Sequence, residues 1–303
     1  MTSELLADAR EDGRERTAAR LLEASAKTSY DPVVQIDWEA PLPEGRYYTP
    51  PHRASLYGTD LWDQLSDEQR IELSKHELAS IASMGIWFET ILMQMLVRHA
   101  YDREPTSSHV QYAYTEIGDE CRHSVMFAKM LERMGAPYYR PRPLTHFLGR
   151  VFKQTSNGPL TFAGALFVEE ILDQLQREAM VDESLQPLVR AVSRVHVVEE
   201  ARHMRYAREA NAAEWAGLGW LERAWTRFVL ARVVYISVTQ LVNERVYATV
   251  GLDPKAARRT AERNPHWRET RRWAARKVVA TLDEAGMIAG PSRRLWKRAG
   301  LVG

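Results

Sequence analysis

Asp119-Glu120-Cys121-Arg122-His123 and Glu199-Glu200-Ala201-Arg202-His203 are two near copies of one pattern, and the fold of the chain follows from them. Each copy has an acidic residue, a glutamate, a variable residue, an arginine and a histidine. On an α-helix, a glutamate and a histidine three positions apart share one face, so both can reach one metal ion. A single Glu-x-x-His is a weak indication, because it often arises as a solvent-exposed pair. Two copies indicate a di-metal site only if each has a partner carboxylate on a neighbouring helix.

Each copy has a glutamate at the same distance before it. Glu89 precedes Glu120 by 31 residues (120 − 89), and Glu169 precedes Glu200 by 31 residues (200 − 169). The midpoints of these two pairs fall within short polar connections, DREPTSS and VDESLQP. Residues equidistant from the turn of an antiparallel helix pair lie at one level. The equal offset therefore predicts two helical hairpins, each with a pair of facing glutamates.

Other glutamates compete for these positions. Glu77 would mirror position 132, two turns beyond the first histidine, which excludes it as a ligand. Glu170 mirrors the second motif almost as well as Glu169, and only the shared offset favours Glu169. Glu89 lies in the apolar run IWFETILMQML, where a lone carboxylate is costly to bury unless it is paired or bound to metal.

A third histidine lies on the same predicted face. His196 precedes Glu200 by four residues and His203 by seven, which favours it as a further ligand. The alternative, a histidine that is only hydrogen-bonded in the core, stays open. Glu116 occupies the equivalent position before Glu120, and we expect it either to accept a hydrogen bond beside the ligands or to bind metal itself.

The acidic residues that precede the two ligand glutamates point in another direction on the helix. We expect Asp119 and Glu199 to hydrogen-bond a histidine on a neighbouring helix, because metal-bound histidines are commonly oriented in this way. Arg122 and Arg202 are expected to pair with these acids. The alternative is a surface ion pair worth ~0–1 kcal/mol.

The expected ligand set is rich in oxygen. Four carboxylates and two or three imidazoles form a hard site, which excludes copper–thiolate and iron–sulfur chemistry. The chain has one cysteine, Cys121, so neither an internal disulfide nor a cluster of thiolate ligands can form. The sequence therefore predicts a pair of iron ions, with manganese as the alternative.

Helical signals dominate the chain. Ser66 and Gln69 have capping-box spacing, as have Ser108 and Gln111, and Pro159 suits the first turn of a helix. No stretch between 66 and 290 carries strand and turn signals. The predicted helices cover 4–25, 67–101, 108 to the Gly135-Ala136-Pro137 stop, 159–180, 184–213, 219–250 and 265–285.

Two antiparallel helix pairs joined by one longer crossover, 136–158, have the connectivity of a ferritin-like bundle. We therefore predict an all-α fold, a ferritin-like four-helix bundle with additional flanking helices. Its expected organisation is an N-terminal helix with an irregular lead-in over 1–65, followed by a di-iron domain over 66–303. Within that domain the bundle occupies 66–213, the extra helices occupy 219–285, and the C-terminal end is basic.

Composition sets further limits. The 303 residues are 45% hydrophobic and 27% charged, as in ordinary folded proteins, and the net charge of +1 gives no reason to expect nucleic acid. No stretch reaches ~20 uninterrupted apolar residues, so no membrane partner is expected. The N-terminal residues lack the apolar core of a signal peptide, so we expect a cytoplasmic protein.

The charge is unevenly distributed. Residues 254–303 carry 13 Lys and Arg against 4 Asp and Glu, a net charge of +9, which leaves −8 for residues 1–253. A solvated helical face is the simpler interpretation. The sharper one is a docking surface for an acidic electron donor such as a ferredoxin, with contacts to Arg271, Arg272, Arg293 and Arg294.

With these residues, the sequence resembles the di-iron arylamine N-oxygenases of the p-aminobenzoate N-oxygenase (AurF) type over about residues 66–250. Its most specific part is His196-x-x-x-Glu200-x-x-His203, because the extra histidine distinguishes this family from most di-iron carboxylate proteins. A ribonucleotide reductase small subunit is disfavoured, since Phe127 stands where the commonest class has its radical tyrosine. The resemblance implies four glutamate and three histidine ligands, here Glu89, Glu120, His123, Glu169, His196, Glu200 and His203.

The resemblance also implies an enzyme that activates dioxygen at two iron ions and oxygenates a small-molecule amine. In the family an arylamine becomes a hydroxylamine and then a nitro compound, within secondary metabolism. Di-iron hydroxylation at carbon, desaturation, a di-manganese enzyme and an iron-storage bundle remain alternatives. The oligomeric state stays open, a homodimer being one expectation.

Overall fold

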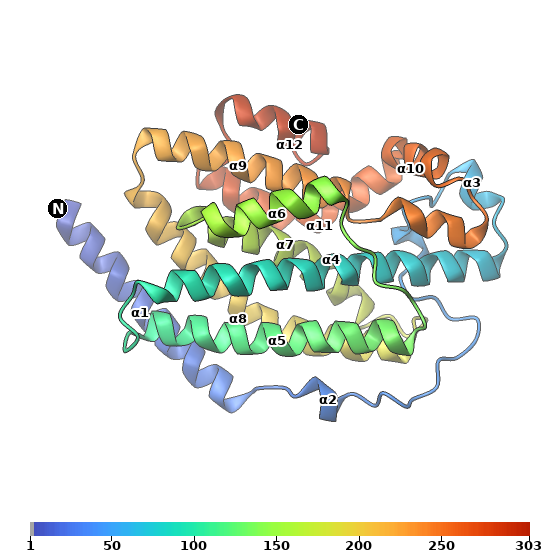
Figure 1. Ribbon diagram of the computed structural model, residues 1–303, viewed down its shortest axis with the longest axis horizontal. Coiled ribbons are helices and arrows are strands. Elements are labelled where there is room, and N and C mark those ends of the chain that lie inside the picture. Colours follow the sequence, from blue (N-terminus) through green and yellow to red (C-terminus); the bar gives the residue numbers. More distant parts are fainter. Residues whose placement is uncertain (1–2) are drawn as a thin grey trace.

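The computed structural model describes residues 3–303, with side chains from Asp12 onward, and most of these residues are in helices (Figure 1). Among these residues, β-structure is limited to one isolated bridge between Tyr47 and Leu185. Four long helices form the bundle, and its closest packed pairs are the first with the second and the third with the fourth. They are α4 (Asp67–Tyr101), α5 (Ser108–Arg133), α7 (Pro159–Ala179) and α8 (Pro187–Gly217). The predicted all-α bundle is confirmed.

Helix starts show how local sequence sets these bounds. Ser66 caps α4 with a reciprocal pair of hydrogen bonds to Gln69, as the spacing predicts. At α5 the cap is Ser107, whose hydroxyl accepts from the Val110 N–H, and the prediction of Ser108 is wrong by one residue. The backbone N–H of Ser108 instead donates to a carboxylate of α1 (Ser3–Lys27) at 2.8 Å, so α1 is tied to the N-terminus of α5.

Shorter elements surround the bundle. The crossover over 136–158, for which no helix was predicted, contains α6 (Pro143–Thr155). The lead-in contains α2 (Pro32–Gln35), η1 (Pro51–Arg53) and α3 (Asp60–Asp63). The helix expected over 219–250 is broken, because Asn243 caps a separate turn and its backbone N–H donates to Ser80 in α4. The C-terminal part consists of α9 (Trp220–Thr239), η2 (Glu244–Val250), α10 (Pro254–Arg263), α11 (Pro265–Glu284), η3 (Gly290–Ser292) and α12 (Arg293–Ala299).

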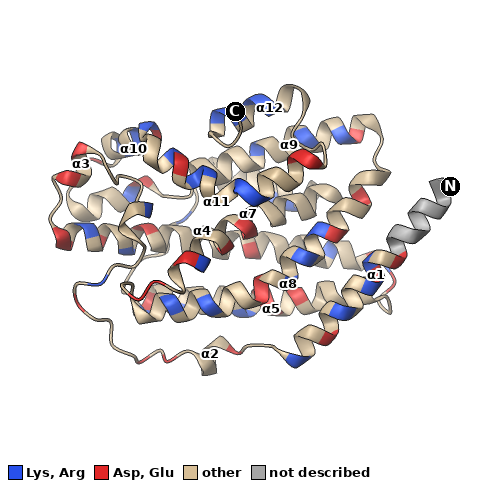
Figure 2. Cartoon of the chain, turned by 180° about the vertical axis from the view of Figure 1, so that it is seen from behind, with Lys and Arg blue, Asp and Glu red and all other residues tan. Residues whose placement is uncertain are grey.

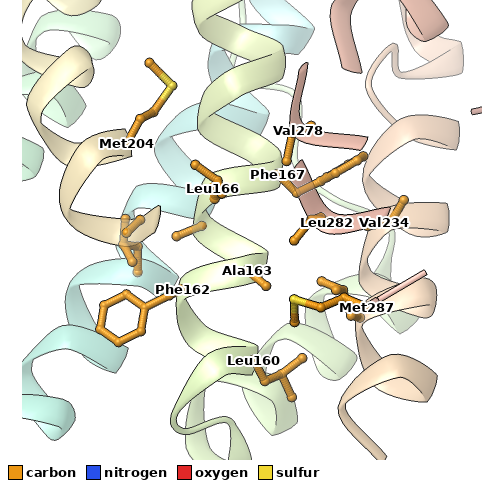
Figure 3. Close-up of a cluster of buried hydrophobic side chains, with 14 of the residues drawn as sticks. Leu160, Phe162, Ala163, Leu166, Phe167, Met204, Val234, Val278, Leu282 and Met287 are labelled. Carbon is orange, nitrogen blue, oxygen red and sulfur yellow. The ribbon is translucent and has the colours of Figure 1, made fainter. Parts of the chain in front are cut away.

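Helix α7 lies at the centre of the protein. Between Pro159 and Asp173 almost every residue is buried, because α8 covers one side and α9 and α11 cover the other. Figure 3 shows Leu166 and Phe167 of this helix packed among side chains of the flanking helices. Full burial of such a side chain is worth ~1.5–3 kcal/mol. The extra helices therefore fix the position of α7 and of the glutamates it carries.

Helix α4 is the one described helix long and apolar enough to cross a membrane by length and composition. However, 56% of its apolar stretch is buried inside the protein. That burial is typical of the core helix of a bundle, and α4 gives no support for a membrane span.

The basic C-terminal segment is partly surface and partly core. Figure 2 shows Lys and Arg on the outward side of α10 and α12. Arg294 is exposed, and Arg272 and Arg293 are half-exposed. Arg271 is only 8% exposed, so its expected place on a docking surface is wrong. Its neighbours on α11 alternate between core and solvent, and the charge pattern alone does not reveal which arginine faces inward.

Candidate metal centre

The two repeated motifs meet inside the bundle. Ligand atoms of Glu120 and His123 from α5 and of Glu200 and His203 from α8 all lie within 4.8 Å of one another. None of the four residues is more than 1% exposed. The Nδ1 atom of His203 lies 3.1 Å from Glu120 Oε1 and 3.3 Å from Glu200 Oε1, and the Nδ1 atom of His123 lies 3.3 Å from Glu200 Oε1. Both imidazoles thus direct the same nitrogen at the shared carboxylates.

The other three residues proposed as ligands extend this cluster. Glu89, on α4, forms a second group with His123 and His196, and Glu169, on α7, forms a third with Glu120 and Glu116. The Nε2 atom of His196 lies 3.3 Å from Glu200 Oε1 and 3.7 Å from Glu89 Oε1. The structure therefore brings all seven residues, and Glu116, into one buried cluster.

The cluster has the electrostatic character of a cation site. Six of its carboxylate oxygens are buried without a hydrogen-bond donor, and burying unpaired carboxylates is costly. Carboxylate oxygens and imidazole nitrogens in this combination are typical ligands of divalent metal ions. The residues present therefore fit a pair of iron or manganese ions. The six oxygens are Glu89 Oε1, Glu116 Oε2, Glu120 Oε1, both oxygens of Glu169, and Glu200 Oε2.

Proton affinities in the cluster follow from burial and crowding. Burial, then repulsion by Glu200, raises the pKa of Glu169 well above its usual value, and burial likewise raises the pKa of Glu116. Burial opposes the charged form of His203, but Glu200 and the other carboxylates raise its pKa. Without a cation the cluster therefore retains protons, and metal binding must release them.

Each motif orients the histidine of the other. The Nε2 atom of His203 lies 3.1 Å from Asp119 Oδ2, and the Nε2 atom of His123 lies 2.8 Å from Glu199 Oε2. Asp119 and Glu199 thus make the cross-helix contacts expected from the sequence. Arg122 pairs with Asp119, and Arg202 lies 3.6 Å from Glu199.

Two polar contacts at the centre were missed by the sequence analysis. Gln176 Oε1 lies 2.6 Å from Nδ1 of His196 and accepts a hydrogen bond from the N–H there. The lone pair of His196 then lies on Nε2, which faces Glu89 and Glu200. Gln176 follows Glu169 by seven residues, two helical turns, and this spacing could have indicated that Gln176 faces the metal centre. Ser124 donates from Oγ to Glu89 Oε2 at 2.6 Å, and no sequence signal indicated this bond.

The competing glutamates lie elsewhere. Glu170 pairs with Arg208 on the α8 side and belongs to none of the three ligand groups. Glu77 accepts hydrogen bonds from the backbone N–H and the hydroxyl of Ser55, which also contacts Tyr247. The preference for Glu169 over Glu170 thus agrees with their positions.

A cavity of about 490 Å³, counting its open mouth, adjoins the centre. Glu89, Glu120, Glu169, His196 and Glu200 line one side of it. The rest of the wall is apolar and comes from four helices, α4, α6, α7 and α9, which contribute Phe88, Leu92, Phe152, Val168, Leu172 and Val233. A small apolar molecule could therefore reach the carboxylates from this side.

A helical bundle with carboxylates and histidines converging from four helices is a ferritin-like di-metal carboxylate protein. Residues 11–286 match the sequence family described as p-aminobenzoate N-oxygenase AurF. The match spans most of the chain, which belongs to this p-aminobenzoate N-oxygenase family.

Three curated relatives are uncharacterized proteins, one from Mycobacterium bovis and two from strains of Mycobacterium tuberculosis. Each is 32% identical to this chain over 218 residues, a stretch that covers 68% of the chain. The same stretch covers 63% of the length of each relative. The names of these relatives give neither an activity nor a substrate.

Proposed function

We propose that the protein is a non-haem di-iron oxygenase that converts a small aromatic amine to its hydroxylamine and nitro derivatives. The observation that carries this proposal is the third histidine. His196 is held by Gln176 so that its Nε2 faces the same carboxylates as His123 and His203. Membership of the p-aminobenzoate N-oxygenase family supports the same chemistry.

The residues of this chain have distinct tasks in the proposed reaction. Glu89, Glu120, His123, Glu169, His196, Glu200 and His203 would hold the two ions, with Glu116 beside them. When bound, the two irons supply the electrons and the Lewis acidity that activate dioxygen. Asp119 and Glu199 keep each histidine in the tautomer that presents Nδ1 to the centre.

The cavity beside the centre sets what can react. Its apolar wall excludes water and accepts a flat aromatic ring. The amine of the substrate can then lie next to the glutamates and histidines of the centre without binding metal itself. An arylamine substrate and a role in secondary metabolism are both part of what we propose.

Product analysis tests the proposal. The protein is loaded with iron, reduced chemically, and exposed to ¹⁸O₂ in the presence of a panel of arylamines. We expect hydroxylamine or nitro products that carry the heavy isotope. Labelled products oxygenated at carbon, or desaturated products, would replace the N-oxygenase assignment by another di-iron oxidation. Uptake of many irons per chain without turnover would indicate a storage protein, and activity restored only by manganese would indicate a di-manganese enzyme.

A further inference from the structure

Two tyrosines lie one helical turn beyond the candidate metal centre. Tyr112, on α5, precedes Glu116 by four residues, and Tyr206, on α8, follows His203 by three, so each shares a helix face with a residue of the cluster. At ~1.5 Å per residue, these steps correspond to about 4.5–6 Å along each helix. Tyr112 is fully buried and Tyr206 is 2% exposed. The centre therefore has two buried phenols as near neighbours, and the proposed reaction uses neither.

Ring contacts join the two tyrosines to a pair of buried histidines. The ring centroids of Tyr112 and Tyr206 lie 4.8 Å apart, and Tyr206 also stacks on His109 at 4.8 Å. His109 in turn lies 5.1 Å from His99. Aromatic rings at these separations are in van der Waals contact. One electron passes readily between redox-active groups in contact, so the two phenols can exchange an electron.

The hydroxyl of Tyr206 has a proton acceptor, and that of Tyr112 has none among the described residues. Tyr206 Oη lies 3.1 Å from the carbonyl oxygen of His109 and 3.2 Å from its Nε2, whereas the Tyr112 hydroxyl is buried without a partner. A phenol that loses an electron becomes a strong acid and must pass its proton to a neighbouring base. Tyr206 is therefore the better site for a lasting oxidised side chain, and Tyr112 is suited only to pass an electron on.

The histidine pair can hold this proton. His99 Nε2 and His109 Nε2 lie 2.9 Å apart, so one of them donates a hydrogen bond to the other. When His99 donates, the lone pair of His109 lies on Nε2, beside the Tyr206 hydroxyl. Burial lowers the pKa of His109 to about 2 and that of His99 to about 3, so both rings are neutral at neutral pH. A base this weak keeps the proton only while Tyr206 is oxidised and returns it on reduction.

The cluster of rings ends close to the surface. His99 Nδ1 lies 3.9 Å from Glu214 Oε1, and Arg103 pairs with the same carboxylate at 3.2 Å. The Arg103 side chain is 37% exposed. This is the end of the bundle where the chain passes from α4 into α5 and where α8 ends (Figure 1). A reductant that approaches this end comes within two histidine rings of Tyr206.

We propose that Tyr206 is a redox residue that gives one electron to the metal centre, by way of Tyr112, when the centre has reacted with dioxygen and no substrate is bound. The electron leaves the Tyr206 phenol, the phenolic proton passes to His109 Nε2, and the centre is reduced by one electron. A neutral tyrosyl radical remains. A one-electron reductant from solution, such as ascorbate or the electron-donor protein, then restores the phenol as His109 returns the proton.

This relay diverts an oxidising equivalent that would otherwise attack the side chains of the centre. The inference rests on the dioxygen-activating metal pair of the proposed function, but not on its substrate.

Electron paramagnetic resonance tests the relay in the absence of any substrate. The iron-loaded protein is reduced chemically, mixed with dioxygen and frozen at increasing times. We expect a transient tyrosyl radical signal that ring-deuterated tyrosine narrows. Tyr206→Phe should abolish the signal, and Tyr112→Phe should slow its appearance and lower its yield. Tyr114→Phe is the matched control, because this tyrosine of α5 is 49% exposed, and it should give the wild-type signal.

Two further readouts cover a variant that folds poorly. 3-Fluorotyrosine placed at position 206 keeps the hydroxyl and its contacts, and should add a fluorine splitting to the radical signal. Intact-mass spectrometry after repeated cycles of reduction and exposure to dioxygen should find more added oxygen in Tyr206→Phe than in the wild type or Tyr114→Phe.

A wild type without a tyrosyl signal, a signal without the fluorine splitting, a full signal in well-folded Tyr206→Phe, or equal oxygen addition in that variant and the wild type would each overturn the inference. A normal radical signal from a protein that oxygenates no arylamine would contradict the proposed function and leave the relay standing. Arylamine oxygenation without any radical would do the reverse.

Discussion

His203 Nε2 lies 3.1 Å from Asp119 Oδ2, so a residue of the first motif orients the histidine of the second. The reverse contact, from His123 to Glu199, is 2.8 Å. These crossed bonds tie α5 to α8 at the level of the ligand glutamates. They give the acidic residue before each glutamate the same contact in both motifs, with the histidine of the other helix.

Asp119→Asn should weaken iron binding about ten- to hundred-fold and leave the fold intact, because an amide does not stabilise the same imidazole tautomer as a carboxylate. Iron titration of the metal-free protein measures the affinity, and far-ultraviolet circular dichroism checks the helices. Glu132→Gln, an exposed change on the same helix, is the control. Equal affinities for the Asp119 and Glu132 variants would show that the crossed bond does not act on the metal.

His196→Ala should reduce the iron content from two per chain toward one, or weaken one of the two binding steps, since Nε2 faces the carboxylates. Gln176→Leu should have a smaller effect in the same direction, because it removes the acceptor that holds the Nδ1 proton. Iron stoichiometry and the diferric absorption spectrum are the measurements. If His196→Ala lowers the melting temperature but keeps two irons and a normal spectrum, His196 is a core residue and not a ligand.

Glu77 should make stability depend on pH. Burial raises its pKa from 4.5 to about 7, while hydrogen bonds from Ser55 oppose the shift. A raised folded-state pKa favours the protonated form, so its stabilising contribution is complete below pH 4.5 and is lost as the pH rises to about 7. The difference between the two pKa values corresponds to up to about 3 kcal/mol.

Glu77→Gln should lack this decline, since a glutamine stays neutral. Urea unfolding of both proteins at pH 5 and pH 8 isolates the effect, because the metal cluster is common to the two. The stability of the wild type relative to the variant should fall between the two pH values. A constant difference would mean that Glu77 is charged in the fold throughout.

Much of this architecture could be predicted from sequence, because the 31-residue offset and the capping residues are local signals. The crossover was harder. No helix was predicted in this Pro- and Arg-rich segment, yet Pro143 occupies the first turn of α6 and Leu144, Phe147 and Leu148 follow at helical spacing. Composition outweighed periodicity in that interpretation, although periodicity is the better guide.

The site was predictable where ligands share a helix face and was not where distant segments meet. Ser124 contacts Glu89 only because α4 and α5 pack at a particular rotation. Arg271 is buried because α11 turns it toward α7 and α9, and no single-helix pattern separates it from exposed Arg272. Side chains selected by tertiary packing therefore need the structure.

The exposed basic end should dock an acidic electron donor. Reversal of Arg272, Arg293 and Arg294 to glutamate should slow donor-dependent turnover severalfold and flatten its salt dependence, because screened charge pairs steer association. Turnover with a chemical reductant should be unchanged. Equal loss with both reductants would indicate damage to the enzyme, and full donor-dependent activity would remove the docking surface.

The central claim is that seven residues hold two metal ions in this bundle. Anomalous diffraction at the iron edge from crystals of the iron-loaded protein tests it most directly. The account predicts two iron peaks among these seven residues, one of them beside His196 and Glu89. A single peak, a zinc ion in place of iron, or peaks away from these residues would contradict it.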